Sequence, residues 1–172
     1  MPKIYYDKDA DLNAIKDKTI AIIGYGIQGR GQALNLRDSG LKVIIGQRQG
    51  GVNYEQAKKD GFNPVDAKTA AKQADVIVIL IHDTPPAEIY KKEIKKGLKK
   101  GKSLVFSHGF NIHFKQIVPD KDIDVFMIAP KGPGALGRKM YEEGKGVPCL
   151  VAIYQDASGN AMKMALAYAK GI

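Results

Sequence analysis

Short apolar runs alternate along the chain with segments whose apolar positions recur at helical spacing. The first run, residues 19–23, is apolar almost throughout, a pattern typical of a strand that is covered on both faces. Later runs have the same character, and residues 61–65 between two helix-like segments provide only a short strand or a turn. The predicted strands are 19–23, 41–45, 75–81, 103–107, 124–129 and 148–154, and the predicted helices are 29–38, 54–60, 66–73, 86–100 and 157–170.

This alternation of strands and helices predicts an α/β fold. Right-handed crossovers would make it a doubly wound, mostly parallel sheet of Rossmann type with helices on both faces. The 172 residues suffice for one such domain, but not for this domain and a full second one. Residues 1–172 are therefore predicted to form a single domain. Ligands of such sheets bind at the carboxyl ends of the strands, so the residues that follow each strand are the first candidates for a site.

A glycine-rich turn joins the first predicted strand to the first predicted helix. Its sequence has the G-x-G-x-x-G pattern, which is weak alone but strong between a strand and a helix. Gly24 permits the tight turn, Gly26 lets the backbone approach a pyrophosphate, and Gly29 allows close packing of helix on strand. The N–H groups and the positive end of the helix would hold the phosphates. The turn predicts a dinucleotide site, the alternative being a glycine-rich turn without a ligand.

The residues after the second predicted strand bear on the choice of cofactor. An NAD site usually has an acidic residue there, but this chain has Gln47 and Arg48, and no carboxylate occurs before Glu55. Arg48 can pair with a 2′-phosphate and lie over the adenine, and Asn53 and the loop N–H groups around Gly51 can add bonds. We therefore expect NADP to be preferred, with NAD as the alternative. Because the loop has no hydroxyl side chain, the preference is expected to be modest.

Residues that could take part in binding or catalysis follow three further predicted strands. His82, Asp83, Thr84, Pro85 and Pro86 follow the third strand, His108 follows the fourth, and Lys131 and Gly134 follow the fifth. A histidine can relay protons near neutral pH, and a nearby lysine can orient or polarise a substrate oxygen. His108 and Lys131 are therefore the candidate catalytic pair, although a structural role for His108 remains the alternative. His82 and His113 are expected to be structural.

Composition narrows the classes of partner. The net charge of +9 is concentrated in lysines of residues 90–102, which have no interleaved aromatic residues and predict a solvated helix face rather than a nucleic-acid site. No apolar run could span a membrane, and no secretory signal is present, so a cytoplasmic protein is expected. The single cysteine, Cys149, lies in an apolar run and is expected to be a buried structural thiol. No cluster has metal-ligand spacing, and Asp83 alone cannot build a magnesium site.

Four stretches of the chain resemble the N-terminal domain of ketol-acid reductoisomerase, also called acetohydroxy acid isomeroreductase. They are GYGIQGRGQALNLRDSG, FSHGFNIHF, APKGPG and GVPCLVAIYQDASGNAMKMALAYAKGI. The resemblance implies an enzyme of valine and isoleucine biosynthesis. It rearranges 2-acetolactate or 2-aceto-2-hydroxybutyrate by magnesium-dependent alkyl migration, then reduces the product to a 2,3-dihydroxy acid with hydride from NADPH.

The resemblance also assigns residues to the site. His108 would match the active-site histidine of the family, and Lys131 would lie beside the small-molecule substrate. The cofactor contacts that it implies are Tyr25, Gly26, Ile27, Gln28, Arg48, Gly51, Asn53, Asp83, Thr84, Pro85, Pro86 and Gly134. Gly24 and Gly29 complete the predicted cofactor-binding set, as members of the glycine turn.

Members of this family continue into a helical, knotted C-terminal domain that carries the acidic ligands of two magnesium ions. This chain ends where that domain would begin, so we expect it to bind cofactor but to need a separate C-terminal domain or subunit for the rearrangement. Two other interpretations stay open. One is a stand-alone NADP-binding protein or sensor, and the other is a different Rossmann dehydrogenase. The oligomeric state is open too.

Overall fold

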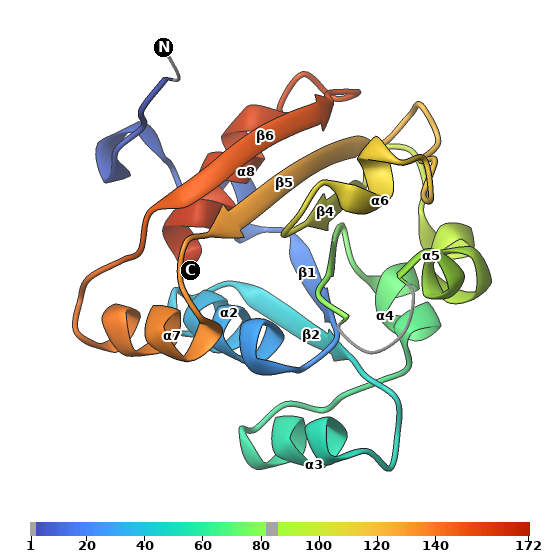
Figure 1. The fold of residues 1–172 in the computed structure, drawn as a ribbon, viewed down its shortest axis with the longest axis horizontal. Coiled ribbons are helices and arrows are strands. Elements are labelled where there is room, and N and C mark those ends of the chain that lie inside the picture. The colour runs from blue at the N-terminus through green and yellow to red at the C-terminus, as the bar shows by residue number, and fades with distance from the viewer. Residues whose placement is uncertain (1–2, 82–85) are drawn as a thin grey trace.

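A six-stranded sheet forms the centre of the computed structural model, which describes residues 3–81 and 86–172 (Figure 1). The strand order is β2-β1-β3-β4-β5-β6. β1 to β5 are parallel, whereas the edge strand β6 runs antiparallel to β5. This confirms the predicted mostly parallel α/β sheet. The strands are β1 (Thr19–Ile23), β2 (Lys42–Gly46), β3 (Val76–Ile79), β4 (Ser103–Phe106), β5 (Asp124–Pro130) and β6 (Cys149–Gln155).

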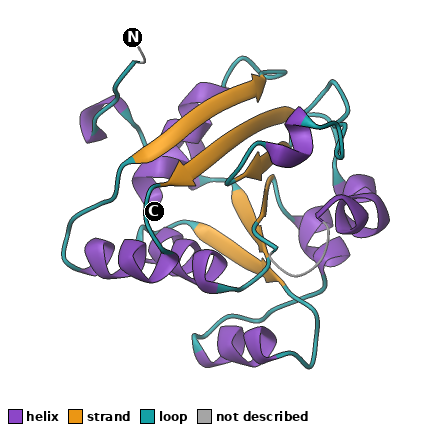
Figure 2. Cartoon of the chain, in the orientation of Figure 1, coloured by secondary structure: helices purple, strands orange, loops and turns teal. Residues whose placement is uncertain are grey.

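Helices cover both faces of the sheet (Figure 2). Successive side chains of β1 point to opposite faces, so Ile20 and Ile22 pack with α2 and α8, whereas Ala21 and Ile23 pack with α4 and η2. The helices are α1 (Asn13–Lys16), α2 (Ile27–Asp38), α3 (Val52–Lys59), α4 (Ala67–Gln73), α5 (Pro86–Ile89), α6 (Phe110–His113), α7 (Gly134–Glu142) and α8 (Ala161–Gly171). Short helical turns are η1 (Asp7–Asp9), η2 (Tyr90–Ile94) and η3 (Lys95–Gly97).

The helix predicted over residues 86–100 is shorter and irregular. It consists of α5, η2 and η3 and ends at Gly97, where a Cβ atom would lie 2.9 Å from the carbonyl carbon of Ala71 in α4. The lysines at 91, 92, 95, 96, 99 and 100 are exposed, as the interpretation of a solvated face predicted. Lys102 differs, because its ammonium donates to the carbonyl oxygens of Ala71 and Lys72 at 2.8 and 3.0 Å and so caps the C-terminus of α4.

Two other boundaries differ from prediction for identifiable reasons. α8 begins at Ala161 instead of residue 157, because the carboxylate of Asp124 accepts bonds from the N–H and hydroxyl of Ser158 and holds that segment as a turn. Residues 61–65 contribute only an isolated bridge, in which Val65 pairs in parallel with Gly46 at the edge of β2.

The sequence did not predict α7. Two of its nine residues are glycines, which lower its intrinsic helix propensity. α7 packs closely on α2, where a Cβ at Gly31 would lie 2.7 Å from the carbonyl oxygen of Gly134. Small residues on both helices thus stabilise α7 through tertiary contact. Within residues 3–81 and 86–172, no helix has the length and apolar character needed to cross a membrane.

Candidate functional site

The glycine turn after β1 has two glycines that the fold requires and one that it does not. Gly24 has a φ of +100°, and a Cβ there would lie 2.6 Å from the carbonyl oxygen of Leu80. A Cβ at Gly29 would overlap the carbonyl oxygen of Gly24. A Cβ at Gly26, in contrast, would meet no atom of residues 3–81 or 86–172 within 4 Å. The open space in front of Gly26 therefore fits a group that approaches the backbone closely, as a pyrophosphate does.

The first turn of α2 faces the same end of the sheet. Gly26 is its N-cap and has no side chain that could satisfy the first N–H groups of the helix. The next side chain, Ile27, is 72% exposed and leaves this end accessible. Unpaired N–H groups and the positive end of a helix together favour an anion. Gly24, Gly26, Ile27, Gln28 and Gly29, all predicted to bind cofactor, therefore lie in one continuous turn.

Tyr25 lies in the same turn, but its side chain is only 2% exposed. Its hydroxyl donates to Asp60 at 2.9 Å, and its ring packs edge-on against Phe62. Burial, and next the bond to Asp60, raise the pKa of Tyr25 above its ordinary value. The side chain thus faces the core, so the predicted contact of Tyr25 with a cofactor could involve only its main chain.

Asp60 is a structural centre that the sequence analysis missed. Its carboxylate accepts bonds from Arg30 at 2.6 and 3.0 Å and from Gln56 at 3.0 Å, in addition to the bond from Tyr25. The hydrogen bond from the Arg30 guanidinium is the main reason why the pKa of Asp60 is lowered. The Tyr25 side chain and the end of α3 are tied together in this way, and no local pattern signals it.

The loop after β2 brings the adenosine-end candidates together. Arg48 is exposed, and the described residues provide no hydrogen bond or ion pair for its guanidinium. Gly51 is the N-cap of α3, and Asn53 is exposed in its first turn. Gln47 is held differently, because its Oε1 accepts the N–H of Tyr25 at 2.9 Å and so joins this loop to the glycine turn.

The strand order changes direction between β1 and β3. The chain leaves β1 toward β2 on one side and returns to β3 on the other, which makes the carboxyl ends of β1 and β3 the switch point of the sheet. Leu80, just after β3, donates its N–H to Ile23 at 2.8 Å. Of the candidates after β3, Pro86 is the first residue of α5, whereas His82, Asp83, Thr84 and Pro85 lie outside the described residues.

His108 and Lys131 follow the neighbouring parallel strands β4 and β5, and both are exposed. Parallel strands end at the same edge of a sheet, so both residues lie at the edge that carries the glycine turn. Their side chains make no hydrogen bond or ion pair with each other. Beside His108, the buried Oγ of Ser107 has no hydrogen-bond partner within the described part of the chain. The sequence analysis missed Ser107, although it lies in the same FSHG stretch.

Gly134 and Cys149 have different surroundings. Gly134 packs against the main chain of Ile27 and Gln28, so a Cβ there would clash with the first turn of α2. Cys149 is half-buried rather than buried as predicted, because it lies in the edge strand β6. Burial raises the pKa of its thiol to about 11, which disfavours the reactive thiolate. Among the described residues, no group of three or more His, Cys, Asp or Glu could hold a metal ion.

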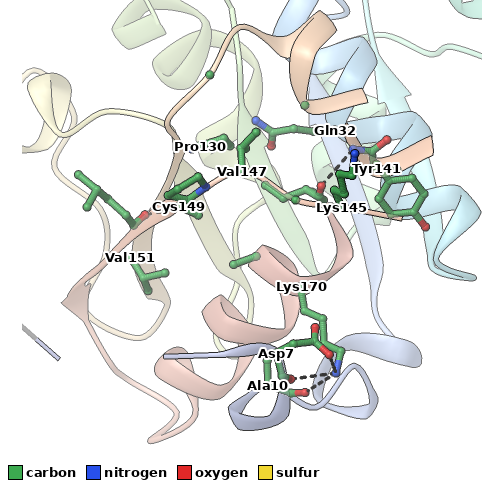
Figure 3. A pocket seen from close by; sticks show the side chains of 18 of the residues that line it. Asp7, Ala10, Gln32, Pro130, Tyr141, Lys145, Val147, Cys149, Val151 and Lys170 are labelled. Carbon is green, nitrogen blue, oxygen red and sulfur yellow. Dashed lines mark hydrogen bonds and ion pairs between the residues drawn. The ribbon is translucent and has the colours of Figure 1, made fainter. Parts of the chain in front are cut away.

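A hollow lies between α2, α7, β6 and α8 (Figure 3). It has a volume of about 1100 Å³, and Gln32, Pro130, Tyr141 and Cys149 are among its lining residues. Gly132 and Gly134 of the β5–α7 loop and Gln28 of the glycine turn also line it, whereas residues 24–27 do not. The other candidate cofactor residues lie along the carboxyl ends of the strands, which is where dinucleotides bind in such sheets.

Known proteins resemble this chain over nearly all of its length. Residues 14–172 match the family described as acetohydroxy acid isomeroreductase, NADPH-binding domain. The chain is 49% identical to an NADH-preferring ketol-acid reductoisomerase from an uncultured archaeon, with a TM-score of 0.94. That match covers 99% of this chain and 53% of the other, so the chain spans about half the length of that protein.

More distant structures share the fold alone. One is a semialdehyde dehydrogenase NAD-binding protein from Cupriavidus necator in complex with calcium and NAD, which is 20% identical with a TM-score of 0.73, over 90% of this chain and 59% of that one. Another is a pyrroline carboxylate reductase from Plasmodium falciparum with NADP bound, which is 14% identical with a TM-score of 0.67, over 91% of this chain and 56% of that one.

Proposed function

The chain belongs to the acetohydroxy acid isomeroreductase family, as that family's NADPH-binding domain, and from this premise we propose that it binds NADPH across the carboxyl ends of β1, β2 and β3. The observation that carries the proposal is the space before Gly26, where a Cβ would meet no atom of the described residues, while the flanking glycines are tightly packed. The pyrophosphate would lie there against the first N–H groups of α2, with the adenosine end toward Arg48.

Replacing Gly26 by alanine separates this role from folding. Because a Cβ at Gly26 has room and its φ of −75° suits any residue, we expect a loss of stability of about 1 kcal/mol or less. The methyl group would occupy the space proposed for the pyrophosphate and weaken NADPH binding by roughly thirtyfold, or about 2 kcal/mol. Calorimetric titration of the wild-type chain and of Gly26→Ala measures this. A wild-type chain that binds neither NADPH nor NADH contradicts the proposal.

The preference for NADPH is supported by the loop after β2. Oε1 of Gln47 is already occupied by the N–H of Tyr25, so it is a poor acceptor for a ribose 2′-hydroxyl, and no carboxylate precedes Glu55. Arg48 is exposed and without a partner among the described residues, as a 2′-phosphate ligand requires. NADH is the second candidate, because the 49% identical reductoisomerase prefers NADH.

Arg48→Asp tests this preference. Loss of a charge-assisted bond and its replacement by repulsion are expected to weaken NADPH binding by about a hundredfold, and NADH binding by less than about threefold. Titration with both nucleotides gives the ratio. Lys59→Asp is the matched control, since it makes the same charge change at an exposed position in the last turn of α3. Equal losses of both affinities in Arg48→Asp would mean that Arg48 does not contact the 2′-phosphate.

We further propose that the chain is the cofactor half of a ketol-acid reductoisomerase that converts 2-acetolactate or 2-aceto-2-hydroxybutyrate to 2,3-dihydroxy acids in the cytoplasm. Bound NADPH supplies a hydride for the reduction. Lys131 would orient a substrate oxygen, and His108 would hold or relay a proton beside it. The magnesium ligands would come from a second domain or subunit.

A further inference from the structure

The short loop that joins β5 to α7 carries Lys131 and rests on the first turn of α2. The N–H of Lys131 donates to the carbonyl of Pro148 at 2.8 Å, and Gly134 packs on the main chain of Ile27 and Gln28. Between these two contacts, the carbonyl oxygen of Gly132 accepts a bond from Nε2 of Gln28 at 3.0 Å. The residue that holds the loop is therefore part of the turn proposed to bind the pyrophosphate.

Gln28 is the outer end of a series of hydrogen bonds that runs into the core. Its Oε1 faces Nε2 of Gln32 at 3.4 Å, and Oε1 of Gln32 accepts the hydroxyl of Tyr168 at 2.7 Å. The two glutamines are four residues apart and so share one face of α2. Gln32 is 4% exposed and Tyr168, on α8, is 1% exposed. Breaking a link would leave a buried polar atom unpaired, which is costly.

The direction of this series of hydrogen bonds is determined at its outer end. The carbonyl of Gly132 can only accept, so Gln28 must present its Nε2 and leave its Oε1 toward Gln32. Gln32 then presents its Nε2 to Gln28 and its Oε1 to the hydroxyl of Tyr168, which donates to it. Reversal of either amide would bring two oxygens or two N–H groups together. The three side chains therefore maintain one another's orientation.

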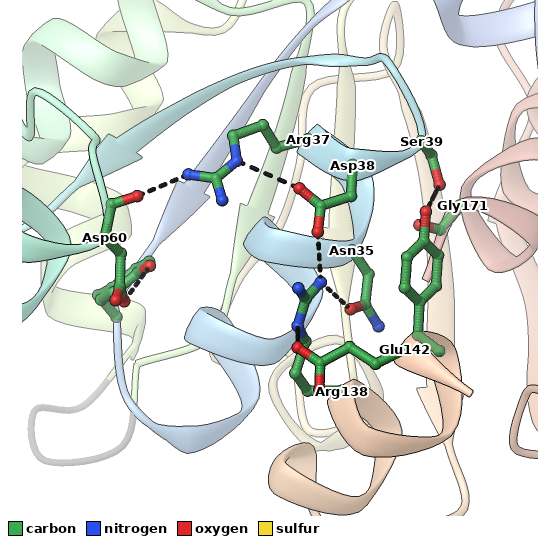
Figure 4. A network of polar contacts seen from close by, with 10 residues as sticks. Asn35, Arg37, Asp38, Ser39, Asp60, Arg138, Glu142 and Gly171 are labelled. Atoms are coloured by element: carbon green, nitrogen blue, oxygen red, sulfur yellow. Dashed lines mark hydrogen bonds and ion pairs between the residues drawn. The ribbon is translucent and has the colours of Figure 1, made fainter. Parts of the chain in front are cut away.

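The far end of α7 is held separately. Arg138 pairs with Asp38 at 2.7 Å and with Glu142 at 2.8 Å, and it donates to Oδ1 of Asn35 at 3.0 Å (Figure 4). Ser39 and Tyr141 add a hydroxyl contact of 2.8 Å. With α7 held at that end against α2, the position of the preceding loop depends on its contacts with Gln28 and Pro148.

We propose that Gln28, supported by Gln32 and Tyr168, is a positioning residue that couples dinucleotide binding at α2 to the placement of Lys131. The inference rests on the proposed function, which assigns the pyrophosphate to this turn and the substrate to Lys131. The main chain of Gln28 belongs to the phosphate-binding turn, whereas its side chain holds the carbonyl next to Lys131. Gln28 was predicted to bind cofactor, and this assigns its side chain to the protein instead.

Amide hydrogen exchange of the 172-residue chain, with and without NADPH, tests the coupling. In the free chain, Gln28→Met keeps the side-chain length but removes the donor, and should speed exchange at Lys131 and Gly132 by about fivefold. NADPH should slow exchange at these two amides in the wild type by about fivefold, and this slowing should be lost in Gln28→Met. In the free chain, exchange in β3 should be the same in Gln28→Met as in the wild type, which distinguishes positioning from general destabilisation.

Two further variants complete the experiment. Tyr168→Phe removes the innermost bond of the series, from Tyr168 to Gln32, and should produce the same change at Lys131 to a smaller extent, about twofold. Tyr141→Phe removes a comparable hydroxyl contact between α2 and α7 that does not belong to this series of hydrogen bonds. It should leave amide exchange at Lys131 unchanged. The inference is overturned if Lys131 exchanges in the free Gln28→Met variant as fast as it does in the wild type. If Gln28→Met does not fold, the same result in Tyr168→Phe overturns it. If the wild-type chain does not bind NADPH while the free-chain differences persist, the proposed function and the coupling fail, and the positioning of the loop by Gln28 stands.

Discussion

Gly29→Ala is expected to unfold the domain or destabilise it by at least about 3 kcal/mol. The added methyl group would overlap the carbonyl oxygen of Gly24. This oxygen belongs to the main chain, so it cannot rotate out of the way as the end of a flexible side chain could. Relief would require α2 to move away from β1 and so disrupt the core around Ile22, whose side chain is also nearby. Equilibrium unfolding in urea measures the change in the free energy of unfolding.

The matched control is Gly137→Ala. Gly137 is also a helical glycine, but a Cβ there would meet no atom within 4 Å in the part of the chain that the structure describes. Alanine at this position is expected to stabilise the protein by about 0.5–1 kcal/mol, because it improves helix propensity without a clash. If Gly29→Ala unfolds at the same urea concentration as the wild type, then close packing of α2 on the glycine turn is not what requires glycine at position 29.

His108→Ala is expected to reduce turnover by about 10²- to 10⁴-fold and to change NADPH affinity by less than about threefold. The imidazole is exposed at the end of β4 and makes no hydrogen bond with the described residues, so its removal leaves the turn and α2 intact. On the proposed function, turnover is measured with the magnesium-binding half present. A fusion of residues 1–172 to that half of the 49% identical reductoisomerase provides it, and consumption of NADPH with 2-acetolactate and magnesium is followed by absorbance.

His113→Ala serves as the control for this variant. His113 lies one turn further along, in α6, with its ring edge-on to Phe114 at 4.8 Å between centroids. It is expected to be structural, so its replacement should leave turnover within about threefold of the wild type. If His108→Ala lowers NADPH affinity by as large a factor as it lowers turnover, His108 supports the cofactor site instead of the proton transfer.

The residues of the glycine turn illustrate how far local pattern reaches. A strand, three spaced glycines and a helix follow one another directly in the chain, so the sequence predicts both the turn and its role. Tyr25 lies inside that pattern and yet faces the core, because Asp60, thirty-five residues away, accepts its hydroxyl. Gln28 also matches the pattern, but its side chain bonds to Gly132, a residue more than a hundred positions later.

The amino-acid sequence by itself determined the mostly parallel α/β sheet, the glycine-rich turn after its first strand and the family of this protein. Hydrophobic period, turn glycines and short motifs all act between near neighbours, where the chain alone specifies geometry. Tertiary structure decided the antiparallel direction of β6, the existence of α7 and the orientation of Tyr25 and Gln28. Each of these depends on a partner distant in sequence, since close backbone packing and buried hydrogen bonds form only after the elements have come together.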